Sequence, residues 1–114
     1  MKILMILNDP PYGTERSYNG LRLAKALARE KAEVSLFLMA DAVNCARRGQ
    51  KVPQGYYNLE LMLKSVSRNG DLLLCGTCMD ARGLTDEDLV EGAQRSTMEA
   101  LAQRTLEADR VLVF

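Results

Sequence analysis

The feature of this sequence that most restricts its fold is the alternation of short apolar runs with longer segments of helical periodicity. Four runs, at residues 3–7, 34–39, 71–75 and 110–114, consist largely of consecutive apolar residues. A strand with this pattern is usually buried on both faces of a sheet. Because helical segments separate the runs, we expect an α/β three-layer sandwich, with a mostly parallel sheet of about five strands and helices on both faces.

The segments between the runs carry helix signals. Residues 18–28 and 57–68 each place tyrosine, leucine, methionine, valine or alanine side chains along one helical face. The Asn-Gly pair ending at Gly70 is expected to stop the second helix in a left-handed conformation. Thr85 opens a capping box before a short helix, whereas we expect residues 76–84 to form a loop.

The length of the chain indicates one domain, and its balanced charge indicates no affinity for polyanions. The 114 residues fit a single domain spanning residues 1–114, which is long enough to bury a core without disulfides or metals. The 15 basic residues balance the 15 acidic ones. A nucleic-acid or membrane-surface binder would carry a basic excess, so we expect neither partner. The near-zero net charge does not oppose self-association.

The sequence also points to a compartment and limits the chemistry. Its first apolar run is too short for a signal peptide, and no stretch reaches the roughly 20 apolar residues of a transmembrane helix. Three cysteines do not suit a secreted disulfide scaffold, so we expect a cytoplasmic protein. The chain has no histidine, which excludes a Ser-His-Asp or Cys-His site within one chain.

Two of the cysteines form the clearest candidate site. Cys75 ends a buried run and Cys78 follows it after Gly-Thr, an unusual arrangement for packing alone. Ligand sites in parallel sheets lie beyond the carboxyl ends of the strands, where residues 8–13, 40–44 and 75–84 should converge. The third cysteine, Cys45, is interpreted as a packing residue.

The surroundings of the pair suit a thiolate or a persulfide. Arg82 lies in the same segment, and the following helix N-terminus adds partial positive charge, although the carboxylate of Asp80 opposes the thiolate. The plainer alternative is that Cys75 is a small buried hydrophobic residue and Cys78 is incidental. Zinc would need four ligands, which one chain does not offer, so we expect no metal and no cofactor. Thioredoxin-like redox chemistry is the rival, but no helix is evident inside the motif.

The same residues resemble a known family. The segment LCGTCMDARGL at residues 74–84 is similar to the cysteine loop of the DsrE/DsrF-like family, in particular its YchN branch. Further similarities, which together extend over nearly the whole chain, lie at residues 11–13, 21–24, 37–43, 48–50 and 108–112. The resemblance implies a flavodoxin-like sandwich and a homotrimer or homohexamer. It also implies a relation to sulfur-relay proteins, with the persulfide-carrying cysteine placed on Cys75.

Three functions remain open at this point. The first is a sulfur carrier or sulfurtransferase component, with Cys75 as nucleophile, Arg82 stabilising its thiolate and Cys78 attacking the persulfide from a mobile loop. Such a carrier needs sulfur donor and acceptor proteins as partners. The second is a thiol–disulfide redox switch that uses Cys75 and Cys78. The third is a non-catalytic oligomeric module that binds a small anion at the strand ends.

Overall fold

The computed structural model describes residues 1–114 and contains a single five-stranded sheet in which every paired neighbour is parallel. Its strand order is β4-β3-β2-β1-β5. The strands are β1 (Lys2–Leu7), β2 (Glu33–Leu38), β3 (Leu72–Cys75), β4 (Ala93–Ser96) and β5 (Arg110–Val113). The α-helices are α1 (Arg16–Arg29), α2 (Leu59–Ser67), α3 (Gly76–Ala81) and α4 (Met98–Glu107). Two 3₁₀ helices, η1 (Ala40–Ala46) and η2 (Asp86–Asp88), complete the fold.

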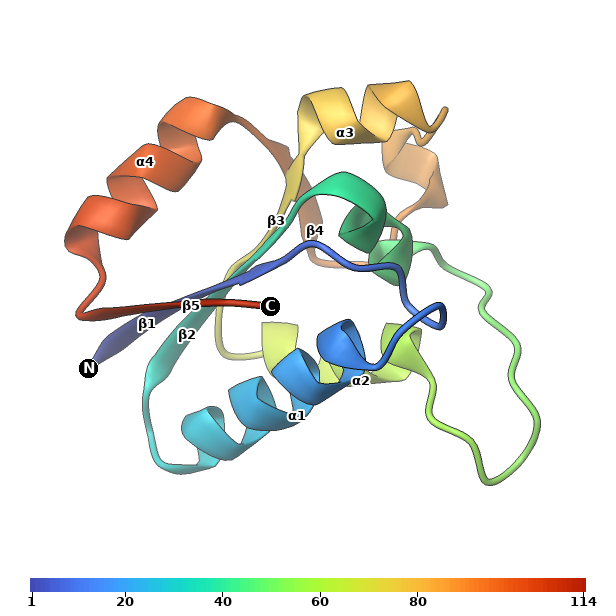
Figure 1. Ribbon diagram of the computed structural model, residues 1–114, viewed down its shortest axis with the longest axis horizontal. Helices are drawn as coiled ribbons and strands as arrows, with labels where there is room; N and C mark the ends of the chain where they lie inside the picture. The colour runs from blue at the N-terminus through green and yellow to red at the C-terminus, as the bar shows by residue number, and fades with distance from the viewer.

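The order of the strands explains the layers. From β1 to β4 the chain steps outward in one direction, so right-handed crossovers place α1 and α2 on the same face of the sheet. The chain then returns past β1 to reach β5, and this reversed step places α4 on the opposite face (Figure 1). The expected three-layer arrangement, flavodoxin-like in its layers and its parallel sheet, is confirmed.

The core is divided unequally by the sheet. Twenty-one buried residues form the larger cluster, which includes the buried positions of α1 and α2 such as Leu21 and Leu63. Only five buried residues, Leu4, Phe37, Leu73, Cys75 and Leu101, form the cluster beneath α4. Cys75 therefore belongs to the smaller, less covered side of the sheet.

Two local expectations were wrong, and one strand was not located in the sequence. Residues 76–84 do not form a loop throughout, because α3 begins at Gly76 directly after β3. β4 gives no apolar run, since its central residues Gln94 and Arg95 are exposed on an edge strand. Gly70 is not left-handed. It is required for another reason, because a Cβ there would lie 2.0 Å from the carbonyl oxygen of Val34.

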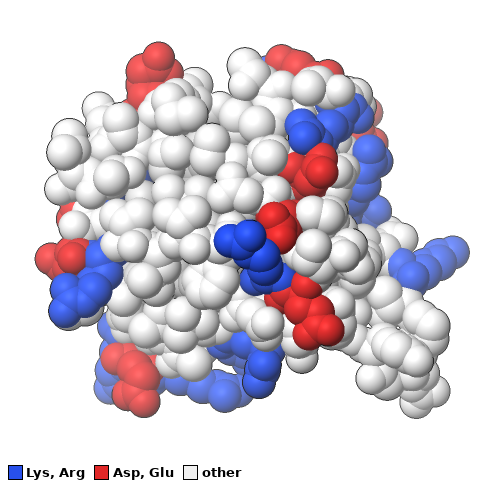
Figure 2. All heavy atoms as spheres, viewed as in Figure 1, with Lys and Arg blue, Asp and Glu red and all other residues white.

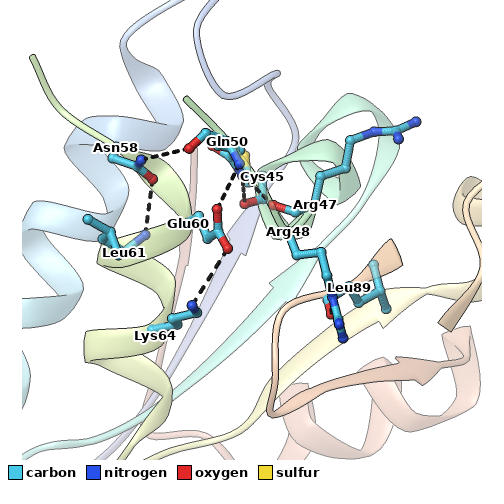
Figure 3. A network of polar contacts seen from close by, with 9 residues as sticks. All are labelled: Cys45, Arg47, Arg48, Gln50, Asn58, Glu60, Leu61, Lys64 and Leu89. Atoms are coloured by element: carbon cyan, nitrogen blue, oxygen red, sulfur yellow. Dashed lines mark hydrogen bonds and ion pairs between the residues drawn. The ribbon is translucent and has the colours of Figure 1, made fainter. Parts of the chain in front are cut away.

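A long connection, residues 47–58, leads from η1 to α2 and is fastened at its base (Figure 3). The backbone N–H of Gln50 donates to Glu60 Oε1 at 2.8 Å, and Asn58 Nδ2 donates to the Gln50 carbonyl at 3.2 Å. Burial raises the pKa of the Glu60 carboxyl, but the backbone N–H groups of Gln50 and Gly49 and the ammonium of Lys64 outweigh it, and the pKa is lowered. The carboxylate thus stays charged and holds the loop.

The molecular surface mixes both signs of charge. In the view of Figure 2, acidic and basic side chains lie interleaved, and the area over α4 and β5 is largely uncharged. The residues left exposed there include Leu106, Val111 and Val113. None of the helices has the length and apolar character needed to cross a membrane.

Candidate functional site

Cys75 occupies the junction between β3 and α3. It is the last residue of the strand, paired with Ser96 of β4, and it is also the residue that precedes the first turn of α3. Only 7% of the residue is exposed. A Cβ at position 76 would lie 2.9 Å from the guanidinium Nε of Arg95, so a larger residue there would displace the Arg95 side chain. The sheet and the helix therefore fix the direction of the Cys75 side chain.

The Cys75 sulfur is surrounded by donors. Its Sγ lies 3.3 Å from Thr77 Oγ1. Burial raises the pKa of the Cys75 thiol, but hydrogen bonds from the Cys78 thiol, the Thr77 hydroxyl and the N–H groups of both residues outweigh it, and the pKa is lowered. Hydrogen bonds to the charged form favour that form, so the Cys75 thiolate is populated more readily than that of an ordinary cysteine.

Cys78 has the opposite balance. Burial and the neighbouring Cys75 sulfur raise its pKa, while the N–H of Ala40 and the charge of Arg82 lower it less strongly, so the Cys78 thiol keeps its proton more firmly than usual. The N–H of Ala40 donates to Cys78 Sγ at 3.2 Å. The pair is thus asymmetric, with Cys78 as the proton donor and Cys75 as the acceptor.

The charged residues are placed differently from the sequence expectation. Arg82 forms an ion pair with Asp41 at 2.8 Å and donates from Nη1 to the Cys78 carbonyl at 3.1 Å. It therefore lies against Cys78, and the hydrogen bonds to the Cys75 sulfur come from other groups. Asp80 does not act as a free carboxylate, since both of its oxygens accept from Arg95, at 2.9 and 2.6 Å. This guanidinium lowers the pKa of the exposed Asp80 carboxyl.

The helix that the motif was expected to lack is present. α3 starts at Gly76, inside the Cys-Gly-Thr-Cys segment, and Cys78 lies in its first turn. Cys78 is therefore held by a helix and is not part of a mobile loop. The structural objection to thioredoxin-like chemistry is removed by the same observation.

Of the three segments expected to converge, η1 contacts both of the others. Ala40 reaches Cys78, and at the far end of η1 the Sγ of Cys45 lies 3.8 Å from the Asp9 carbonyl. Cys45 is fully buried, and burial raises the pKa of its thiol to about 12, which agrees with a packing role. No group of three or more potential metal-ligating side chains is gathered anywhere in the structure.

Sequence reasoning left three site residues without a role. Thr77 lies within the motif, and the start of a helix directly after Cys75 would have indicated that its hydroxyl and N–H point toward the sulfur. Arg95 extends to the site from β4, a strand that no apolar run in the sequence predicts. Ala40 contributes a backbone group, for which no side-chain signal exists.

Comparison with known proteins assigns the chain to a family. The family model described as "DsrE/DsrF-like family" matches residues 1–114. The chain belongs to the DsrE/DsrF-like family. It is 44% identical to Protein YchN of Escherichia coli strain K12, over 99% of this chain and 98% of that protein. It is 29% identical to Sulfurtransferase TusD of Cronobacter sakazakii, over the full length of both chains.

Structural comparison agrees with this assignment. The crystal structure of the ychN protein from E. coli superimposes with a TM-score of 0.94 at 44% identity, covering 100% of this chain and 99% of that one. The expected membership of the DsrE/DsrF-like family, with YchN-like character, is therefore confirmed. The more distant similarity to TusD relates this family member to sulfur-relay proteins.

Proposed function

We propose that this protein carries sulfur as a persulfide on Cys75, between a sulfur donor and a sulfur acceptor protein. The observation that supports the proposal most directly is the set of donors around the Cys75 sulfur, which lowers the pKa of a thiol held at the end of β3. The thiolate is the nucleophilic form of cysteine. Membership of the family and the similarity to proteins named as sulfurtransferases support the same reaction class.

Loading follows from the chemistry of thiolates. The Cys75 thiolate attacks the outer sulfur of a persulfide on the donor, so that the donor's sulfur–sulfur bond breaks and the donor leaves as a thiolate. Cys75 then bears one additional sulfur. Transfer to an acceptor thiolate repeats the same exchange in the opposite direction, with the Cys75 thiolate as the leaving group. We expect both steps to take place in the reducing cytoplasm.

Cys78 provides an internal alternative to an acceptor. Its thiolate would attack the inner sulfur, Cys75 Sγ, so that a Cys75–Cys78 disulfide forms and the outer sulfur leaves as hydrosulfide. Two thiols from a cellular reductant would restore the pair. Arg82 keeps a role in this proposal as the cation beside Cys78 rather than beside Cys75.

Intact-protein mass spectrometry after exposure to a persulfide donor tests the assignment. Wild type should gain the mass of one sulfur, Cys75→Ser should gain none, and Cys78→Ser should load and keep its sulfur longer, because the internal attack is gone. Loading that is lost only in the Cys78→Ser variant would reverse the roles. Equal loading of both variants would remove the carrier proposal and favour the small-anion-binding module.

A redox switch is the second candidate, and the placement of both cysteines at the start of α3 favours it. Cys75 directly precedes α3 and Cys78 lies in its first turn, which is the arrangement of a Cys-x-x-Cys redox motif. A mild disulfide oxidant should then remove two hydrogens from wild type. A protein that forms the disulfide but never gains sulfur mass is a switch and not a carrier.

We also propose that the protein acts as a homo-oligomer, a trimer or a hexamer. The sheet face on the α4 side is incompletely covered, and Val113 of β5 is 62% exposed beside Val111 at 37%. Exposed apolar surface of this kind is typical of subunit contacts. Val113→Glu should shift sedimentation toward the monomer, whereas Leu61→Glu, at an exposed position of α2, should not. A wild-type monomer at micromolar concentration would contradict the proposal.

A further inference from the structure

The corner that follows β2 holds a residue in an uncommon backbone conformation. Ala40, the first residue of η1, has a φ of +48°, and Lys31 is the only other non-glycine residue with a positive φ. A positive φ is disfavoured for a residue that carries a Cβ. Residues held in such a conformation cluster at functional sites, where the surrounding structure stabilises them. Here the N–H of the same residue donates to Cys78 Sγ at 3.2 Å.

Rotation of one peptide plane would give this corner a less strained backbone conformation. Rotation of the peptide plane between Met39 and Ala40 would return φ of Ala40 to negative values while leaving the flanking chain nearly in place. Because the N–H and the C=O of a trans peptide point in opposite directions, the rotation would turn a carbonyl oxygen toward the Cys78 sulfur. It would also remove the hydrogen bond between the Ala42 N–H and the Met39 carbonyl. The observed orientation of this peptide thus allows two hydrogen bonds, one from the Ala42 N–H to the Met39 carbonyl and one from the Ala40 N–H to the Cys78 sulfur.

The next residue holds the same cysteine at a second point. The carboxylate of Asp41 binds Arg82 at 2.8 Å, and Arg82 donates to the Cys78 carbonyl at 3.1 Å. Two consecutive residues of η1 therefore fix Cys78, one at its sulfur and one through its backbone. The titratable and charged groups that face Cys78 are Cys75 from the end of β3 and Arg82, with Asp41 bound to Arg82.

We propose that Ala40 is a positioning residue of the cysteine pair, whose left-handed backbone directs an N–H at Cys78 and stabilises the Cys78 thiolate. That thiolate is the species which attacks a persulfide on Cys75, so the consequence for sulfur transfer rests on the proposed function. The stabilisation itself is a property of the unloaded protein. It offsets part of the burial that raises the pKa of Cys78.

The test measures alkylation of Cys78 by iodoacetamide against pH in the Cys75→Ser background, which removes the coupling between the two thiols. Ala40→Val should slow this reaction about threefold near neutral pH. The reason is that a β-branched residue favours the rotated peptide, and losing a hydrogen bond to an anion lowers the thiolate population about tenfold, partly offset by the higher nucleophilicity of a more basic thiol. Ala40→Gly should keep the reference profile, since glycine adopts the left-handed conformation freely.

Two controls keep the result interpretable. Lys31→Val places the same residue at the other positive φ, +68°, and should leave Cys78 alkylation unchanged. In the same Cys75→Ser background, the NMR chemical shift of the Ala40 amide proton should change with pH. The midpoint of this change should match the midpoint of the Cys78 alkylation profile. This second readout needs no substitution at Ala40.

An Ala40→Val profile equal to the reference, or an Ala40 amide signal indifferent to Cys78 ionisation, would overturn the inference. Persulfide loading is measured separately on the variants that carry Cys75. Absent loading with the Ala40 effect intact would refute the carrier function and leave the positioning role in place.

Discussion

Replacing Thr77 with valine removes one donor from the Cys75 sulfur at almost constant volume. The hydroxyl lies 3.3 Å from Cys75 Sγ, and Thr77 itself is exposed, so water replaces part of the lost hydrogen bond. A hydrogen bond to a charged group contributes about 1.5–3 kcal/mol, and solvent together with the remaining donors reduces this to about 1 kcal/mol here. That energy corresponds to about a fivefold smaller thiolate population near neutral pH.

The sign of the pH dependence follows from which form is stabilised. The hydroxyl favours the thiolate, so its loss raises the pKa of Cys75 and lowers its reactivity at neutral pH. Because a more basic thiolate is intrinsically more nucleophilic, the rate of alkylation should fall only about two- to threefold near pH 7. Above the pKa values of both proteins the variant should equal or slightly exceed wild type.

The assay is alkylation of Cys75 by iodoacetamide between about pH 6 and pH 10, with each cysteine followed by peptide mass spectrometry. Thr77→Ser, which keeps the hydroxyl, is the matched control and should follow wild type. A Thr77→Val profile identical to wild type would refute the role of the hydroxyl. A rate reduced by the same factor at every pH would refute the electrostatic explanation and indicate a change of access instead.

Three further predictions concern the frame around the site. Gly70→Ala should lower the free energy of unfolding by about 1–3 kcal/mol, measured by thermal denaturation, because the added methyl group overlaps the Val34 carbonyl at 2.0 Å. An unchanged melting temperature would show that the turn into β3 moves freely. Cys45, whose pKa is raised to about 12 by burial, should stay unmodified at pH 8 in the native protein and react only after unfolding. Native labelling of Cys45 as fast as Cys75 would contradict its burial. Arg95→Gln should raise the pKa of Asp80 toward its ordinary value, followed by carboxyl NMR signals, because Arg95 is the main cause of its low pKa. An Asp80 that titrates as before would show that the ion pair does not form in solution.

The parts of this protein that its sequence determined are those carried by local hydrophobic periodicity. The runs that became β1, β2 and β3 are apolar because these strands are buried in the core, whereas the run that became β5 lies on an edge strand and leaves Val111 and Val113 exposed. The spacing of the runs by helices dictated a parallel sheet. The place of Cys75 at the end of β3 followed from the same pattern. The residue types of the motif, compared with a known family, indicated the family to which the chain belongs.

Features that depend on contacts between residues distant in the sequence were decided only by the tertiary structure. β4 is a strand because it pairs with β3, not because Gln94 and Arg95 favour one, and its pairing is what delivers Arg95 to Asp80. α3 is six residues long and begins with glycine, so its propensity is low, and it is held where Met79 is buried in the core.

The contacts that hold Cys78 are also decided by the tertiary fold. Arg82 pairs with Asp41, a residue 41 positions away, and the N–H that reaches Cys78 comes from Ala40, the first residue of η1. Neither partner is visible in a local pattern, because a sequence window records which residues are apolar but not which loops meet at the edge of a sheet. The sequence therefore identified the cysteine pair, and the packing of η1 against α3 supplied the Ala40 N–H and the Asp41 carboxylate that hold Cys78.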